Sequence, residues 1–184
     1  MKTILTLVMV CAMFQPPQPP QHALLPQNLL LQQETPSTCT LCAGTMMVRN
    51  ALYIRGCERW EDTAEDDVAA VAWSPKGLLW NWNYSQNCTT VCVGHETLTG
   101  VGEEVLCQIL QDHPEGIVLY CGGTTHHGVF LTRYTDGIFY CSDPAVGYSG
   151  AEIALEDSLL GARLGSQNAI LDAVSAYWYV ENGE

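Results

Sequence analysis

Two apolar runs separated by a tight turn, 127–134 and 138–141, constrain the fold more than any other part of the sequence. The turn between them, Thr135-Asp136-Gly137, carries an Asp-Gly pair, which favours a β-hairpin because both positions tolerate a positive φ. Such a turn also sets the register, so that residues whose numbers add to about 273 lie opposite each other. The sequence therefore predicts an antiparallel sheet in the C-terminal half.

Helical spacing of apolar side chains marks much of the remaining chain. The pattern predicts helices over 40–55, 61–73, 102–111 and 166–177. It also predicts a strand over 117–121, an edge strand over 178–180, and an aromatic strand or loop over 78–84. Because helices precede the sheet without β-α-β alternation, the predicted fold class is α+β, with N-terminal helices packed on an antiparallel sheet.

The sequence predicts one folded domain, residues 27–184, behind a leader and a linker. Residues 1–14 join a basic start to a short apolar stretch, which fits a secretory signal peptide and fits equally a frayed N-terminus without a targeting role. Residues 15–26 have the proline and glutamine content of an extended linker. The apolar stretch is too short for a stable membrane span. We expect a secreted protein if the leader is a signal peptide, and a cytoplasmic one otherwise.

Seven basic residues against 20 acidic ones give the chain a net charge of −13. Lysines and arginines are too few and too scattered to neutralise a phosphate backbone, so nucleic acid is not an expected partner. The surplus of carboxylates favours basic partners, although only weakly.

Nine cysteines are many for a chain of this length. Cleavage of the leader at or beyond position 11 leaves eight, and reserving one of these as a nucleophile leaves an odd number, which cannot pair completely. We therefore expect most of them to be reduced core residues, including Cys107, Cys121 and Cys141.

The residue types of a thiol nucleophile site occur at positions that can meet in space. Cys39 stands at the N-terminus of the first predicted helix, where the helix dipole lowers the pKa of a thiol. His127 begins the first strand of the hairpin, and Asp143 follows the second strand. The two lie within about three positions of the hairpin register, so the carboxylate can reach the imidazole and fix its tautomer.

Two further residues belong to the candidate site or its border. Gln33 lies six residues before Cys39, and its amide can donate to an oxyanion if the intervening turn folds back. His126 precedes His127, and neighbouring strand residues point to opposite faces. Only one of the two histidines therefore meets the thiol, and we expect the other to face solvent or the rim of the cleft.

These segments resemble the papain-like cysteine peptidases that process bacteriocin leaders at double-glycine sites, and more closely their uncharacterised bacterial peptidase-like relatives. The shared pattern is Gln33-x5-Cys39 at a helix start, His127 before an apolar run, and Asp143-Pro144 sixteen residues after the histidine. Cys39-Thr40-Leu41-Cys42 stands where the family usually has Cys-Gly-Pro-Ala, and Gly128 stands where an aliphatic or aromatic residue is more usual.

The resemblance implies a papain-like domain over 27–184 and a cysteine peptidase that acts on a peptide or protein substrate. It implies that Cys39 is the nucleophile and His127 the base. It also implies that Asp143 orients the base and that Gln33 supplies an oxyanion donor.

Two other function classes remain open. A thiol-redox protein would use the pair Cys39 and Cys42, although thioredoxin-like proteins alternate strands and helices around such a motif. A zinc site built with Cys88 and Cys92 lacks the usual spacing in its second half, and no metal or other cofactor is expected. A papain-like scaffold with an idle site would instead serve as a binding module.

Overall fold

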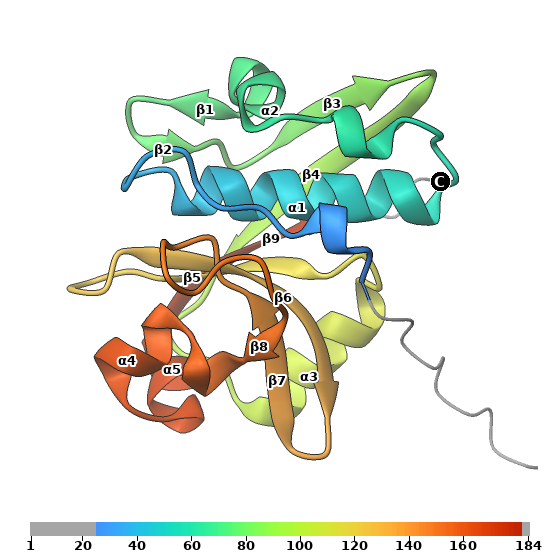
Figure 1. Cartoon of the computed structure of the whole chain (residues 1–184). Coiled ribbons are helices and arrows are strands. Elements are labelled where there is room, and N and C mark those ends of the chain that lie inside the picture. The colour runs from blue at the N-terminus through green and yellow to red at the C-terminus, as the bar shows by residue number, and fades with distance from the viewer. Residues whose placement is uncertain (1–24, 182–184) are drawn as a thin grey trace, which may run out of the picture.

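The computed structural model describes residues 25–181 of the 184-residue chain (Figure 1). The predicted signal peptide and nearly all of the predicted linker lie outside these residues. The helices are α1 (Cys39–Ile54), α2 (Glu65–Ala72), α3 (Glu103–Asp112), α4 (Leu159–Leu164) and α5 (Gln167–Ala173). The strands are β1 (Trp73–Ser74), β2 (Gly77–Leu78), β3 (Trp82–Gln86), β4 (Thr89–Thr97), β5 (Ile117–Cys121), β6 (His127–Thr135), β7 (Ile138–Ser142), β8 (Ile153–Ala154) and β9 (Val174–Val180).

Helix α1 lies at the centre of the fold. Every residue from Cys39 to Leu52 is buried, and a helix buried all round must be covered on every side. One side packs on β5, β6 and β9, and the other contacts α2, β2 and a 3-10 turn at Trp60–Asp62 (Figure 1). The predicted helix over 40–55 is confirmed to within one residue at each end, and its first residue is Cys39.

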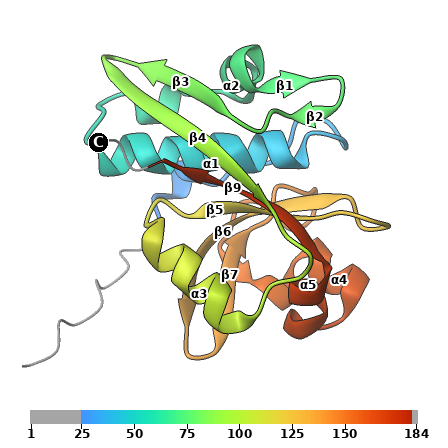
Figure 2. The ribbon, with the colours of Figure 1, turned by 180° about the vertical axis from the view of Figure 1, so that it is seen from behind.

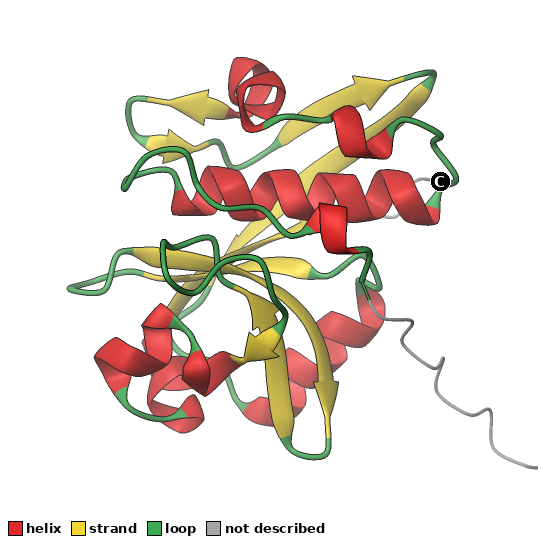
Figure 3. Cartoon of the chain, viewed as in Figure 1, coloured by secondary structure: helices red, strands yellow, loops and turns green. Residues whose placement is uncertain are grey.

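A seven-stranded antiparallel sheet, in the order β3-β4-β9-β5-β6-β7-β8, curves around α1. Seen from behind, β4 runs from the layer above the helix to the layer below it, and β9 runs beside it from the level of the helix downward (Figure 2). Helices α3, α4 and α5 pack on the face of the sheet that is turned away from α1 (Figure 3) and enclose a second core. The predicted α+β class, with N-terminal helices packed on an antiparallel sheet, is confirmed.

The predicted hairpin forms between β6 and β7, with Asp136-Gly137 at its turn in the positive-φ region. The pairs next to the turn follow the predicted register, and a β-bulge between Leu131 and Arg133 then shifts the pairing by one residue. Side chains alternate between the two faces of a strand, so a shift of one residue exchanges the faces. The bulge therefore places Asp143 on the same face of the sheet as His127. In an unbroken register the two side chains would lie on opposite faces.

Strand β9 corrects two predictions. The predicted helix over 166–177 ends at Ala173, and the segment 178–180 is not an edge strand, because β9 lies between β4 and β5 inside the sheet. Both faces of β9 are buried: Trp178 and Val180 belong to the core around α1, whereas Tyr177 belongs to the second core. A strand that is apolar on both faces lacks the alternation of apolar and polar residues, so the sequence pattern did not predict β9.

The hairpin of β3 and β4 was only partly predicted, since the segment 78–84 covers no more than its start. Its turn, Asn87 and Cys88, has positive φ angles of 47° and 65° without the glycine that usually signals such a turn. The predicted helix over 61–73 also proves shorter, because α2 covers Glu65–Ala72 and Trp73 already begins β1.

Candidate active site

The thiol of Cys39 sits at the positive end of α1. The residues before it form a turn in which Thr38 donates its backbone N–H to the carbonyl of Thr35 at 3.2 Å. The carbonyl of Thr38 then accepts the first helical hydrogen bond, from Cys42 N at 2.8 Å. Cys39 is 7% exposed and lies on the wall of an open cleft, so the sulfur is largely desolvated and still reachable.

His127, the first residue of β6, stands between this thiol and a buried carboxylate. Its Nε2 lies 2.8 Å from Oδ1 of Asp143, and its ring lies close enough to the thiol of Cys39 for each group to shift the pKa of the other. With Nε2 committed to the carboxylate, Nδ1 is the ring nitrogen left for the sulfur. The structure thus brings together the cysteine, the histidine and the aspartate that the sequence singled out.

Asp143 is fully buried, and three donors satisfy its carboxylate. Oδ1 accepts from the backbone N–H of Ala145 at 2.8 Å as well as from His127, and Oδ2 accepts from Leu159 N at 2.8 Å, where α4 begins. A buried charge is tolerated when it is paired and hydrogen-bonded in this way. The loop after β7 and the start of α4 therefore hold the carboxylate in place beneath the imidazole.

The ionisation of the three groups is coupled. Burial raises the pKa of the Cys39 thiol, but the hydrogen bond and charge of His127 outweigh it and leave this pKa below its usual value. Burial lowers the pKa of His127, whereas Asp143 and Cys39 together raise it to about 9. Burial raises the pKa of Asp143, and His127 with the two backbone donors brings it below its usual value. These directions favour a thiolate–imidazolium pair at neutral pH.

Gly128 completes the contact between β6 and the start of α1. The backbone N–H groups of Gly128 and Thr40 help to lower the pKa of the Cys39 thiol. A Cβ on residue 128 would lie only 2.7 Å from Cγ2 of Thr40, so a side chain there would push the strand from the helix. Sequence reasoning did not assign this glycine a role in the site, and the signal available was a glycine directly after the histidine.

Gln33 is buried beside the site, and its hydrogen bonds do not involve the thiol of Cys39. Its backbone N–H donates to Pro144 O at 2.9 Å, and its side-chain Nε2 donates to Thr35 O at 2.7 Å. Its Oε1 is buried without a hydrogen-bond partner among the described residues. One amide proton is still free for an oxyanion, so the role of Gln33 stays a prediction.

Cys42 lies one helical turn beyond Cys39 and in a different environment. Burial and the neighbouring carboxyl of Glu65 raise the pKa of Cys42 well above its usual value. All eight cysteines between residues 25 and 181 are free thiols. Of the three that were predicted to be core residues, Cys121 and Cys141 are buried and Cys107 is half-buried.

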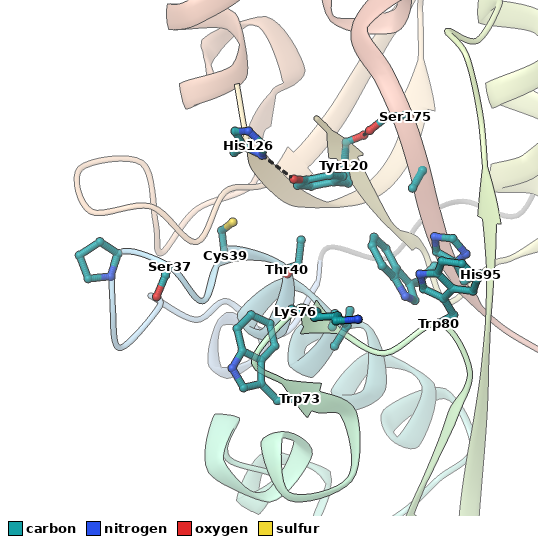
Figure 4. Close-up of a pocket in the computed structure, with 15 residues that line it drawn as sticks. Ser37, Cys39, Thr40, Trp73, Lys76, Trp80, His95, Tyr120, His126 and Ser175 are labelled. Carbon is teal, nitrogen blue, oxygen red and sulfur yellow. Dashed lines mark hydrogen bonds between the residues drawn. The ribbon is translucent and has the colours of Figure 1, made fainter. Parts of the chain in front are cut away.

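The cleft beside Cys39 has a volume of about 610 Å³ (Figure 4). His126 lines it, with a positive φ of 42°, and its Nδ1 lies 3.0 Å from the hydroxyl of Tyr120. Of the two adjacent histidines, His127 therefore lies beside the thiol, and His126, in the turn before β6, lines the cleft. The lining residues come from the start of α1, from β1, β2 and the chain after them, and from β4, β5, β9 and the turn before β6: Pro36, Ser37, Cys39, Thr40, Trp73, Lys76, Gly77, Leu78, Trp80, His95, Tyr120, His126, Ser175, Ala176 and Trp178.

Between residues 25 and 181 no helix is both long enough and apolar enough to cross a membrane. Nor does this part of the chain gather three or more histidine, cysteine, aspartate or glutamate side chains in an arrangement that could hold a metal ion. Comparison of the chain with protein-family models, with curated proteins and with solved structures finds no match.

Proposed function

We propose that this chain is a papain-like cysteine peptidase that hydrolyses a bond in a peptide or protein substrate. One observation carries the proposal: the Cys39 thiol, at the start of a buried helix and on the wall of an open cleft, lies beside His127, whose Nε2 lies 2.8 Å from the buried carboxylate of Asp143. A thiol, a base and an orienting carboxylate in this order are the parts that acyl transfer to sulfur requires.

In the first half of the reaction, the Cys39 thiolate adds to the carbonyl carbon of the peptide bond. Negative charge develops on the carbonyl oxygen, and the N–H groups at the start of α1, with the amide of Gln33, are the nearest candidates to stabilise it. His127 then gives its proton to the amide nitrogen, the C–N bond breaks, and the amine product leaves an acyl group on the sulfur as a thioester.

In the second half, His127 takes a proton from a water molecule that attacks the thioester carbonyl. The C–S bond breaks, the acid product leaves, and the thiolate–imidazolium pair is restored. The carboxylate of Asp143 keeps Nδ1 of the ring toward the sulfur and stabilises the imidazolium. No metal or redox partner takes part in these steps.

The alternative of a thiol-redox protein is less well supported, because burial and Glu65 raise the pKa of Cys42 and so disfavour its thiolate. An idle binding scaffold would not need a buried aspartate whose carboxylate is aimed at a histidine. The location of the protein is a separate proposal. Secretion, rather than a cytoplasmic location, is supported only by the signal-peptide pattern of residues 1–14.

The test is the rate of iodoacetamide labelling against pH, mapped to each cysteine, for the wild type and for His127→Ala. We expect fast labelling at Cys39 with an apparent pKa below about 8.5, the usual value for a free thiol, and a rise of that pKa in the variant. The exposed thiol of Cys88 serves as an internal reference. Labelling of Cys39 that is no faster than that of Cys88 and does not depend on His127 would contradict the peptidase proposal and leave a binding scaffold or a thiol-redox protein.

Cleavage is tested separately. A proteome-derived peptide library is incubated with the wild type and with Cys39→Ala, and new termini are identified by mass spectrometry. New termini that depend on Cys39 support a peptidase. A reactive Cys39 without any such termini would contradict peptide-bond hydrolysis.

A further inference from the structure

The lining of the cleft beside Cys39 contains no acidic side chain, in contrast to the acidic chain as a whole. The chain has 20 acidic residues, yet none of the residues that line the cleft is an aspartate or a glutamate. The lining does include Lys76, which is the one lysine between residues 25 and 181, together with His95 and His126. Charges farther away than about 10 Å are largely screened by salt, so a ligand in the cleft responds mainly to this local set.

Lys76 differs from every other permanently cationic side chain in the described part of the chain. Each of the arginines there donates to a backbone carbonyl or a carboxylate: Arg49, Arg55, Arg59, Arg133 and Arg163. The Nζ of Lys76 has neither a hydrogen bond nor an ion pair within residues 25–181. It extends from the β1–β2 turn into the cleft, toward the side where Trp80 and His95 lie (Figure 4).

Aromatic rings form the wall beside this ammonium group. Trp80 stacks on His95 with ring centroids 5.3 Å apart and an interplanar angle of 3°, and His95 in turn contacts Trp178 at 4.7 Å. Trp178 is held in place by a hydrogen bond from its Nε1 to the carbonyl of Leu79 at 2.8 Å. Trp80 itself is 68% exposed, so one face of a large apolar ring is open to a ligand.

We propose, on the basis of the proposed peptidase function, that this part of the cleft binds a carboxylate of the substrate at Lys76 and an apolar or aromatic side chain against Trp80. The carboxylate is either the side chain of an aspartate or glutamate near the cleaved bond or the free C-terminus of the peptide. Either one gives Lys76 the anionic partner that the protein does not supply.

The first test needs no activity. N-acetyl-phenylalanine and its amide are titrated against the whole chain, and binding is followed by tryptophan fluorescence. The acid should bind about threefold more tightly than the amide, since a partly exposed ion pair contributes a factor of this order. Lys76→Met should abolish the preference, and Lys76→Arg should keep it. Equal binding of acid and amide to the wild type, or a preference that survives in Lys76→Met, would overturn the proposal.

Two variants serve as controls for that titration. Arg59→Met removes one positive charge outside the cleft, where Arg59 pairs with Asp62, and should leave the preference unchanged. Trp80→Ala should weaken the acid and the amide alike, because it removes stacking without changing the charge. A loss of the preference in Arg59→Met would assign the effect to net charge and count against Lys76.

The peptide library distinguishes the two sources of the carboxylate. A side-chain carboxylate predicts that cut peptides carry aspartate or glutamate at a constant distance from the new terminus. A C-terminal carboxylate predicts cuts at a constant distance from the end of the peptide. Cuts with neither pattern would overturn the proposal. If no peptide is cut, the peptidase function fails, while the titration still decides whether the cleft binds carboxylates.

Discussion

The two sides of the cleft are built in opposite ways. On the buried side, Cys39, His127 and Asp143 are almost inaccessible to solvent, and the carboxylate of Asp143 is hydrogen-bonded to His127 and to two backbone N–H groups. On the open side, Trp80 and Lys76 are exposed and have few partners of their own. The difference separates two tasks, because preorganised groups in a dry site set the rate of a reaction, whereas exposed groups set the choice of ligand. Substitutions on the buried side should therefore change rate by far more than substitutions on the open side.

The largest effect should come from the thiol itself. We expect Cys39→Ser to lower the rate of peptide cleavage by about 10⁴-fold or more, as removal of a nucleophile does in other hydrolases. Cys42→Ser is the matched control, since Cys42 lies one turn away in the core. It should cost about 1–3 kcal/mol of unfolding free energy for burying a hydroxyl, with cleavage preserved. Cleavage rates and urea unfolding measure both, and equal losses of activity would indicate a thiol pair instead.

The two adjacent histidines provide the next comparison. His127→Ala should lower cleavage by about 10²–10⁴-fold, because it removes the general acid and base, and should raise the pKa of Cys39. His126→Ala should change the rate only a few-fold, because His126 contacts Tyr120 and not the carboxylate. The pH dependence of alkylation at Cys39 distinguishes the two, and similar profiles for both variants would contradict the assignment of His127.

The pH profile sharpens the role of the buried carboxylate. The pKa of His127 is raised from its usual 6.5 to about 9, so its protonated form stabilises the fold fully below pH 6.5, and that contribution is lost as the pH rises through 9. The cleavage rate should fall over the same alkaline range, since acylation needs the imidazolium. Asp143→Asn should move this fall to lower pH and reduce the rate by about 100-fold, the lower end of what general acid–base catalysis contributes. An alkaline limb that stays near pH 9 in the variant would exclude Asp143 as its cause.

Much of the buried side could be predicted from the sequence, because local signals determine where its segments begin and end. The Thr-Pro-Ser-Thr turn marks the start of α1 at Cys39, and the Asp136-Gly137 turn places the two hairpin strands. The bulge after Leu131 could not be predicted, since no glycine or proline marks it, and yet it brings Asp143 to the face of His127. The predicted register was therefore close enough to bring His127 and Asp143 near each other, although their contact depends on the bulge.

The open side could not be predicted in the same way. Lys76, Trp80, His95 and Trp178 come from the β1–β2 turn, the chain after β2, and strands β4 and β9. They meet only because β9 runs through the middle of the sheet, and β9 carried no alternating pattern. The contacts depend on long-range pairing of strands whose sequences give no local sign of their partners.

The smallest predicted effect concerns the contact between β6 and the start of α1. Gly128→Ala places a methyl group 2.7 Å from Cγ2 of Thr40 and should lower the unfolding free energy by about 1–3 kcal/mol, the usual cost of overpacking. Thr40→Ser removes that Cγ2, and the remaining contacts of the new methyl, Leu119 O and Thr40 Cα at 3.5 Å, are ordinary ones. The double variant should therefore be more stable than Gly128→Ala alone. Urea unfolding of the wild type, the two single variants and the double variant gives the coupling energy between the two positions. Additive changes in unfolding free energy would mean that β6 does not depend on this glycine to approach α1.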